Sequence, residues 1–248
     1  MNRFVLATLV AMVAPLTAAQ EGTVTYRVTT RIVVELPPEL AHMADQLPSE
    51  QSASKTLVFD EAAALTSNAP RVAVDEPAPL PDPDEPRMVF RIGGHASDDQ
   101  THVDFETGVV TETRDFLGRM FRITGERPAL AWRLTGERGQ FLGYPCQRAV
   151  ADRDSTTVEA WFTPAVPVPA GPGPYGGLPG LVLVLADGRR TYEATEVRLE
   201  PLGAPIEAPA GGREVTREAF DRIVKEKMEE LEASRPRGER GGLIIRRQ

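Results

Sequence analysis

The chain has 248 residues, and its 28 lysines and arginines against 36 aspartates and glutamates give a formal net charge of −8. An acidic chain of this kind does not attract a phosphate backbone, which excludes a general nucleic-acid-binding protein. The single cysteine, Cys146, excludes disulfides within the chain and any zinc or iron–sulfur site that needs several cysteines.

The beginning of the chain has the pattern of a secretory signal peptide. Arg3 supplies a basic start, residues 4–16 are almost wholly apolar, and small residues follow up to Ala19. The apolar run is shorter than the roughly 20 residues that span a bilayer. We therefore expect cleavage after Ala19 and export of residues 20–248 to the periplasm, the outer-membrane surface or the medium, with no membrane-spanning segment in the mature protein.

Short runs of β-favouring residues recur from Gly22 onward. Val24, Tyr26 and Val28 alternate with polar residues, which is the period of a half-buried strand. Asp187-Gly188 predicts a hairpin turn, and residues 106–108 and 135–139 predict further turns. About ten strands at this spacing predict an antiparallel sheet that must curl, pack in two layers or close. The further runs that we expect to be strands are 55–60, 87–92, 102–110, 119–124, 130–135, 146–151, 156–162, 181–186 and 191–199.

Two proline-rich stretches interrupt this pattern. Residues 70–86 combine six prolines with five acidic residues, which predicts an acidic mobile loop because such a segment buries little apolar surface. Residues 164–179 combine prolines with glycines and lead directly into the apolar run at 181–186, which predicts an ordered connection.

The C-terminal region predicts a helix over residues 216–233. Thr216 can cap it, and apolar residues recur at helical spacing behind the cap. We expect this apolar stripe to pack on the sheet, with a partner-binding helix as the alternative; residues 241–245 could form a final strand. The stripe consists of Phe220, Ile223, Val224, Met228 and Leu231.

No catalytic signature is complete in this chain. Neither G-x-S-x-G nor H-E-x-x-H occurs, so we assign no catalytic residue and expect no cofactor. His95, His102 and Asp104 could bind a divalent ion, but the same alternation is typical of the solvent side of a half-buried strand. A metal-handling protein and an envelope hydrolase that uses acidic residues stay open as alternatives.

Aromatic residues cluster in the central part of the sequence. Exposed together, they could stack on a sugar or hold a peptide, although aromatic side chains more often fill a core. These ligand-binding candidates are Trp132, Tyr144, Trp161, Phe162 and Tyr175.

One segment resembles a known family. The sequence Tyr175-Gly176-Gly177-Leu178-Pro179-Gly180-Leu181-Val182 resembles the signature of the GLPGLI family of exported bacterial proteins, with valine in place of the final isoleucine. The stretches 142–149 and 159–164, which come before it, resemble the same family in the same order. Residues 131–134 begin the same series, so the resemblance extends over about 50 residues and is more specific than any single motif.

The resemblance implies a fold and a class of function. The family is similar to the bowl-shaped, non-catalytic N-terminal module of a bacterial peptide:N-glycanase, which implies a mainly β protein: one domain over residues 20–248, built on a strongly curved antiparallel sheet (a bowl or a partly open barrel) with a C-terminal α-helix. It also implies an envelope binding or assembly module for a glycan, a peptide or an outer-membrane TonB-dependent receptor. We expect a structural role for the motif residues, because glycine and proline before an apolar strand are explained by sterics alone. These residues are Cys146, Gly176, Gly177, Leu178, Pro179, Gly180 and Leu181.

Overall fold

The computed structural model describes residues 20–32, 34–35, 49–69, 99–153, 156–188, 190–233 and 244–245. The expected signal peptide, the acidic segment 70–86, the strand at 87–92 and His95 lie outside these residues. Within the described part of the chain, no helix is long and apolar enough to cross a membrane.

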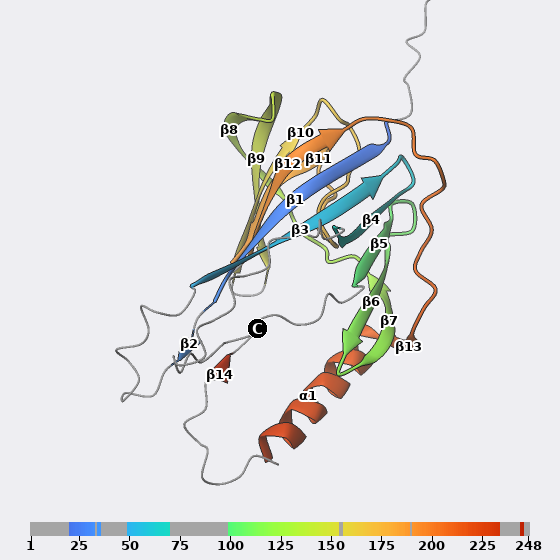
Figure 1. Ribbon diagram of the computed structural model, residues 1–248. Helices are drawn as coiled ribbons and strands as arrows, with labels where there is room; N and C mark the ends of the chain where they lie inside the picture. The colour runs from blue at the N-terminus through green and yellow to red at the C-terminus, as the bar shows by residue number, and fades with distance from the viewer. Residues whose placement is uncertain are drawn as a thin grey trace, which may run out of the picture.

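Twelve strands form one curved sheet that does not close (Figure 1). Strand β1 (Gly22–Arg31) lies in its middle. On one side of β1 the chain runs outward through β3 (Glu50–Phe59), β4 (Ala63–Asn68), β5 (Gln100–Asp104), β6 (Val109–Phe116) and β7 (Arg119–Glu126). On the other side it returns from the edge through β8 (Arg133–Phe141), β9 (Tyr144–Arg153), β10 (Thr156–Thr163), β11 (Leu181–Asp187) and β12 (Arg190–Arg198). These pairings are antiparallel, and the expected curved antiparallel sheet is confirmed.

Two features at the margins differ from the prediction. Strand β13 (Arg213–Thr216) extends the sheet beside β7 and runs parallel to it, because the long connection after β12 brings the chain to that edge from the far side. A separate two-stranded sheet pairs β2 (Val34–Glu35) with β14 (Ile244–Ile245), which falls within the strand expected at 241–245; residues 241–243 of that prediction lie outside the described residues.

Alternation along the strands determines which face of the sheet is buried. Val24, Tyr26 and Val28 of β1 are buried on one face, as their spacing predicted. Leu57 of β3 and Phe162 of β10 lie on the same face and belong to the same hydrophobic cluster. We call this the core face, and the opposite one the outer face.

The connection between β10 and β11, residues 164–180, is ordered and packs into the core. Its buried side chains include Val166, Val168, Ala170 and Leu178, which join the cluster formed by the core face. The ordered connection predicted for this Gly/Pro stretch is therefore what the structure contains.

Strand β8 runs through residues 135–139, where the sequence predicted a turn. The chain does not reverse there, because the register of β8 against β9 shifts between Leu134 and Arg138 and Gly136 takes a φ of 82°. A bulge and a turn both favour glycine at positive φ, so the glycine signal alone does not distinguish them. The reversal comes later, at Leu142 and Gly143, both with positive φ.

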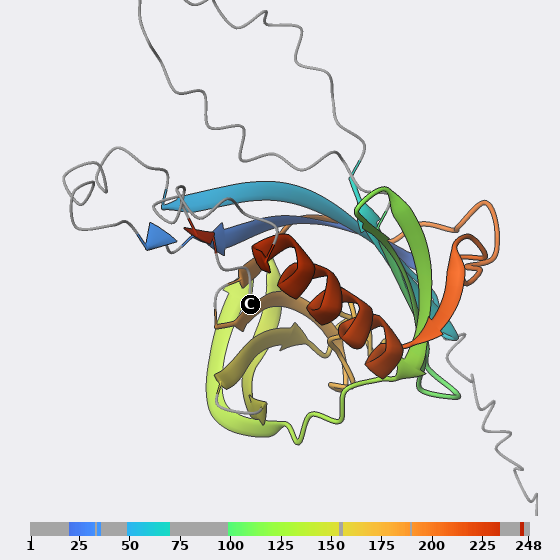
Figure 2. The same ribbon diagram turned by 90° about the horizontal axis from the view of Figure 1, so that it is seen from below.

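Helix α1 (Arg217–Ala233) lies on the core-face side of β6 and β7, at the open end of the curved sheet (Figure 2). The Ala219 amide donates a hydrogen bond to the Thr216 hydroxyl at 3.2 Å, so the predicted cap is present. Phe220 packs edge-on against Phe121, with ring centroids 5.4 Å apart. The expectation that the whole apolar stripe packs on the sheet is wrong for its C-terminal half, because the helix runs past the sheet and leaves Met228 and Leu231 exposed.

Candidate functional site

The structure separates the five aromatic residues that the sequence grouped together. Phe162 is fully buried in the core, and Tyr175 is only 5% exposed. Trp132 packs against the same core, and its indole Nε1 donates a hydrogen bond to the Gly176 carbonyl at 2.9 Å. Tyr144 on β9 and Trp161 on β10 are half-buried; alternation along the strands places them on the outer face, and both also pack against the edge of the core cluster.

A third aromatic residue, Phe141, completes this group. It stands directly opposite Tyr144 at the end of the β8–β9 hairpin, and its ring centroid lies 5.4 Å from that of Trp161. Gly139 leaves room for the indole, since a Cβ there would approach the Trp161 Cζ3 atom to 2.9 Å. We call Phe141, Tyr144 and Trp161 the aromatic patch. The sequence search missed Phe141; the one available signal was its place just before the Leu142-Gly143 turn, opposite Tyr144.

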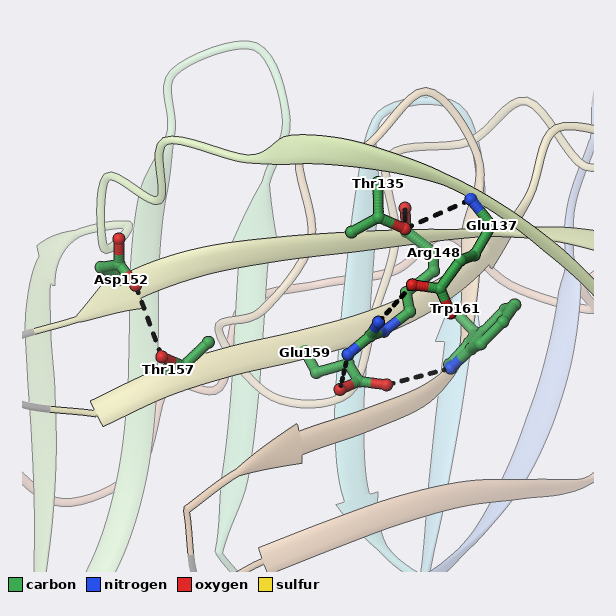
Figure 3. A network of polar contacts seen from close by, with 7 residues as sticks. All are labelled: Thr135, Glu137, Arg148, Asp152, Thr157, Glu159 and Trp161. Atoms are coloured by element: carbon green, nitrogen blue, oxygen red, sulfur yellow. Dashed lines mark hydrogen bonds and ion pairs between the residues drawn. The ribbon is translucent and has the colours of Figure 1, made fainter.

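A polar network adjoins the aromatic patch on the same face (Figure 3). The guanidinium of Arg148 on β9 bridges two carboxylates, at 2.5 Å from Glu137 on β8 and 2.7 Å from Glu159 on β10. The indole Nε1 of Trp161 donates to the second oxygen of Glu159 at 3.2 Å. Three neighbouring strands thus hold a tryptophan, an arginine and two glutamates in fixed relative positions.

Electrostatics keep this network ionised. The hydrogen bonds that Arg148 donates to the carboxylates of Glu159 and Glu137 raise its pKa. The hydrogen bond from Arg148 lowers the pKa of Glu159 and outweighs its partial burial. Arg148 therefore stays a charged donor and Glu159 a charged acceptor at neutral pH.

The GLPGLI-like segment makes its contacts with the protein's own interior. Arg127 donates from Nε to the Pro174 carbonyl at 3.2 Å and from Nη2 to the Pro169 carbonyl at 3.1 Å. The Gly173 amide donates to the hydroxyl of Thr66 on β4 at 2.9 Å. Side chains distant in sequence thus satisfy part of the backbone polar groups of this segment, and backbone amides of β11 satisfy others, such as Leu181 donating to the Val166 carbonyl and Val182 to the Ala170 carbonyl.

Two glycines of the motif lie where no other side chain fits. A Cβ on Gly176 would come within 2.0 Å of Arg127 Nη2, and a Cβ on Gly180 within 2.2 Å of the Thr163 carbonyl oxygen. Leu178 and Leu181 between and beyond them are buried in the core. Pro179 lies between Leu178 and Gly180 and is exposed.

The family comparison matches this same region. A family model described as "Protein of unknown function (Porph_ging)", which is of the GLPGLI type, matches residues 150–184. The resemblance to the GLPGLI family is confirmed. The match covers β10, the buried segment and the first half of β11. A search of the curated proteins finds no significant match to the chain.

The fold is also similar to that of PNGF-II, a peptide:N-glycanase. Its structure in space group P21 aligns with a TM-score of 0.55 and 16% identity over 84% of this chain and 34% of that one. The structure in space group C2 gives 0.51 and 16%, over 82% and 33%. At this identity the likeness concerns the fold, and the chain spans about a third of the PNGF-II chain.

The metal candidates do not form a cluster among the described residues. His102 on β5 is 7% exposed, and burial lowers its pKa. The carboxylate of Asp104 accepts a hydrogen bond from the Thr107 amide at 2.8 Å, which closes the turn after β5. No group of three histidine, cysteine or acidic side chains that could hold a metal ion occurs in the described part of the chain.

Cys146 is a free, buried cysteine on β9. Burial raises the pKa of its thiol, which disfavours the reactive thiolate. In the hydrophobic cluster Cys146 packs as a small apolar residue.

Proposed function

We propose that this chain is an exported, non-catalytic binding protein of the cell envelope that recognises a glycan through the aromatic patch and its polar network. The fold likeness to a peptide:N-glycanase supports a glycan-related role, and the signal-peptide pattern supports export. A peptide ligand and an outer-membrane receptor as partner stay predictions.

The observation that carries the proposal is the combination of side chains on the outer face. A sugar ring has an apolar C–H face and hydroxyl groups around its edge. Trp161 and Phe141 offer partly buried rings for the apolar face, while Arg148, Glu137 and Glu159 offer donors and acceptors for the hydroxyls. Binding sites for small polar molecules commonly combine these two kinds of group.

The site is also preorganised. Arg148 is held at two points, and Glu159 is held by both Arg148 and Trp161. Side chains that are already ordered lose little rotamer freedom when a ligand binds, so more of the contact energy contributes to affinity.

The same geometry argues against the alternative of an acid-using hydrolase at this site. A glycosidase needs a carboxyl group that is still protonated near neutral pH, and its pKa must therefore be raised. The pKa of Glu159 is lowered instead, and the Arg148 guanidinium stands between the two carboxylates. This arrangement suits hydrogen bonding to a ligand better than proton transfer.

A glycan array that includes N-linked and neutral oligosaccharides, followed by calorimetric titration of the strongest hit, tests the proposal. The variant Trp161→Ala should weaken binding at least about tenfold, because it removes the central ring of the patch. Leu231→Ala, an exposed change on α1, is the matched control and should leave the affinity unchanged. Absence of binding to any glycan, or equal affinity of the two variants, would contradict the proposal.

A further inference from the structure

The core face of the sheet changes character along its strands, from apolar to basic. On β1, Tyr26 is opposite Lys55 of β3, and Thr30 is opposite Arg190 of β12. Residues opposite each other in an antiparallel pair point to the same face. Lys55 and Arg190 therefore lie on the core face, on the two strands that flank β1 (Figure 1).

Aromatic and polar contacts extend this basic region towards β9. Arg190 is hydrogen-bonded to Tyr192, whose ring centroid is 6.4 Å from that of Tyr175. The guanidinium of Arg153, at the end of β9, lies 5.7 Å from the Tyr175 ring centroid and donates to its hydroxyl at 2.7 Å. The Tyr175 hydroxyl in turn donates to Asp187.

Contacts on the other side extend it to β6. Arg114 lies 2.8 Å from the carboxylate of Glu112, which is also bound at 2.5 Å by Arg217 of α1. Two arginines thus share one buried acid and leave an excess of positive charge. Burial lowers the pKa of Lys55, Asp99 opposes this shift, and the charges of Arg114 and Arg190 add to the lowering. These cations therefore act on one another across the sheet. We call Lys55, Arg114, Arg153 and Arg190 the basic arc.

The basic arc stands out against an acidic chain. Three of its members, Lys55, Arg153 and Arg190, form no direct ion pair with a carboxylate among the described residues, although Asp187 lies opposite Arg190 in the β11–β12 pair and its charge raises the pKa of Arg190. Arg153 and Arg190 are exposed, and Lys55 is half-buried. Grouping like charges that are not individually paired costs free energy unless a ligand of opposite charge binds there.

We propose that the basic arc is a second binding site, for the carboxylate or sulfate groups of an acidic oligosaccharide. Its cations come from four strands. Two of these strands, β3 and β12, lie on either side of β1, so their backbones are roughly 10 Å apart at about 4.8 Å per strand. Such a spread fits a ligand with several separated charges better than a single inorganic anion. The planar guanidinium groups match the geometry of carboxylate and sulfate oxygens.

The site is separate from the aromatic patch, because the two lie on opposite faces of the sheet. A single sugar cannot contact both sites, so a substitution in one site should not change binding at the other. Trp161→Ala should not change the affinity of the basic arc for an acidic ligand, and substitutions in the basic arc should not change the affinity for neutral glycans.

The test is titration of the purified protein with a heparin-derived hexasaccharide at low and physiological salt, with maltohexaose as the neutral probe. The double variant Lys55→Ala/Arg190→Ala should lose at least about tenfold in affinity, and binding by the unmodified protein should weaken as salt rises. Arg119→Ala/Arg138→Ala removes the same charge from exposed sites elsewhere and should change the affinity less than about twofold. Circular dichroism and the Tm check that both variants fold. If the double variant does not fold, the single variant Arg153→Ala, at an exposed position, takes its place.

Three results would overturn the proposal. The first is no binding of the acidic hexasaccharide, and the second is an equal loss in the two double variants. The third is binding of poly-glutamate as tight as that of the hexasaccharide and equally sensitive to Lys55→Ala/Arg190→Ala, which would make the ligand a peptide. If Trp161→Ala lowers the affinity for neutral glycans while the two double variants bind the acidic hexasaccharide equally tightly, the proposed function holds and this inference fails.

Discussion

Gly180, at the end of the buried segment, permits the sharpest prediction about stability. A Cβ at this position would lie 2.2 Å from the Thr163 carbonyl oxygen, 2.7 Å from the Thr163 carbonyl carbon and 3.0 Å from the Pro164 nitrogen. All three are backbone atoms at the end of β10, and Thr163 is fully buried. No flexible side chain can move aside, so Gly180→Ala must displace the backbone.

The size of the effect follows from this contact. The nearest approach of 2.2 Å is 1.2 Å less than the 3.4 Å at which ordinary van der Waals contact begins. Overpacking of a core costs about 1–3 kcal/mol, and the upper end applies where the backbone must move. We expect Gly180→Ala to lower the free energy of unfolding by about 3 kcal/mol, which corresponds to a Tm decrease of roughly 6–12 °C for a chain of this size.

Urea unfolding followed by tryptophan fluorescence measures this loss, and Gly173→Ala is the matched control. Gly173 lies in the same segment with a φ of 62°, but a Cβ there meets no atom within 4 Å. Gly173→Ala should lower the free energy of unfolding by only about 1 kcal/mol, which is the cost of placing an alanine in the left-handed backbone conformation. If Gly173→Ala is as destabilising as Gly180→Ala, the steric account of the motif is wrong.

Two further predictions concern residues that connect the sheet to other parts of the protein. Arg127→Ala leaves the Pro174 carbonyl without its side-chain donor and removes one of the two donors to the Pro169 carbonyl, and should cost about 2 kcal/mol in the same urea experiment; a change within error would contradict this role. Burial alone would raise the pKa of Glu112, but its two neighbouring arginines outweigh burial and hold the pKa below 4.5. The stability that this ionised carboxylate contributes should therefore be present above pH 4.5 and be lost as the pH falls through the lower pKa of the folded state. Glu112→Gln should flatten the acid limb of a plot of unfolding free energy against pH, and an unchanged acid limb would refute the assignment.

Several parts of the fold could be predicted because they depend on neighbours in sequence. The period of two in β1 identified its buried residues, and Thr216 followed by apolar residues at helical spacing identified α1. The Gly/Pro stretch before β11 was predicted to be ordered because it leads directly into a strongly apolar strand. Each of these signals reports a local backbone preference or a choice of face.

The candidate site could be predicted only in part. Tyr144 and Trp161 were named, but nothing in the sequence separated them from Phe162, which follows Trp161 directly and points into the core. Phe141 was missed because its contact with Trp161 crosses a bulged strand pair. Alternation along a strand predicts that two successive residues point to opposite faces of the sheet. The residues that each face contacts depend on how the strands pair.

The basic arc shows the same division most clearly. Lys55 and Arg190 are far apart in sequence and each looks like an ordinary surface residue there. They flank one strand only because β12, at the end of the second meander, returns to pair with β1. The acidic balance, the strand and helix segments and the family signature could be recognised from the amino-acid order alone, because all of them depend on composition and local order. Which charges and rings meet depends on strand order and register, and long-range packing fixes both.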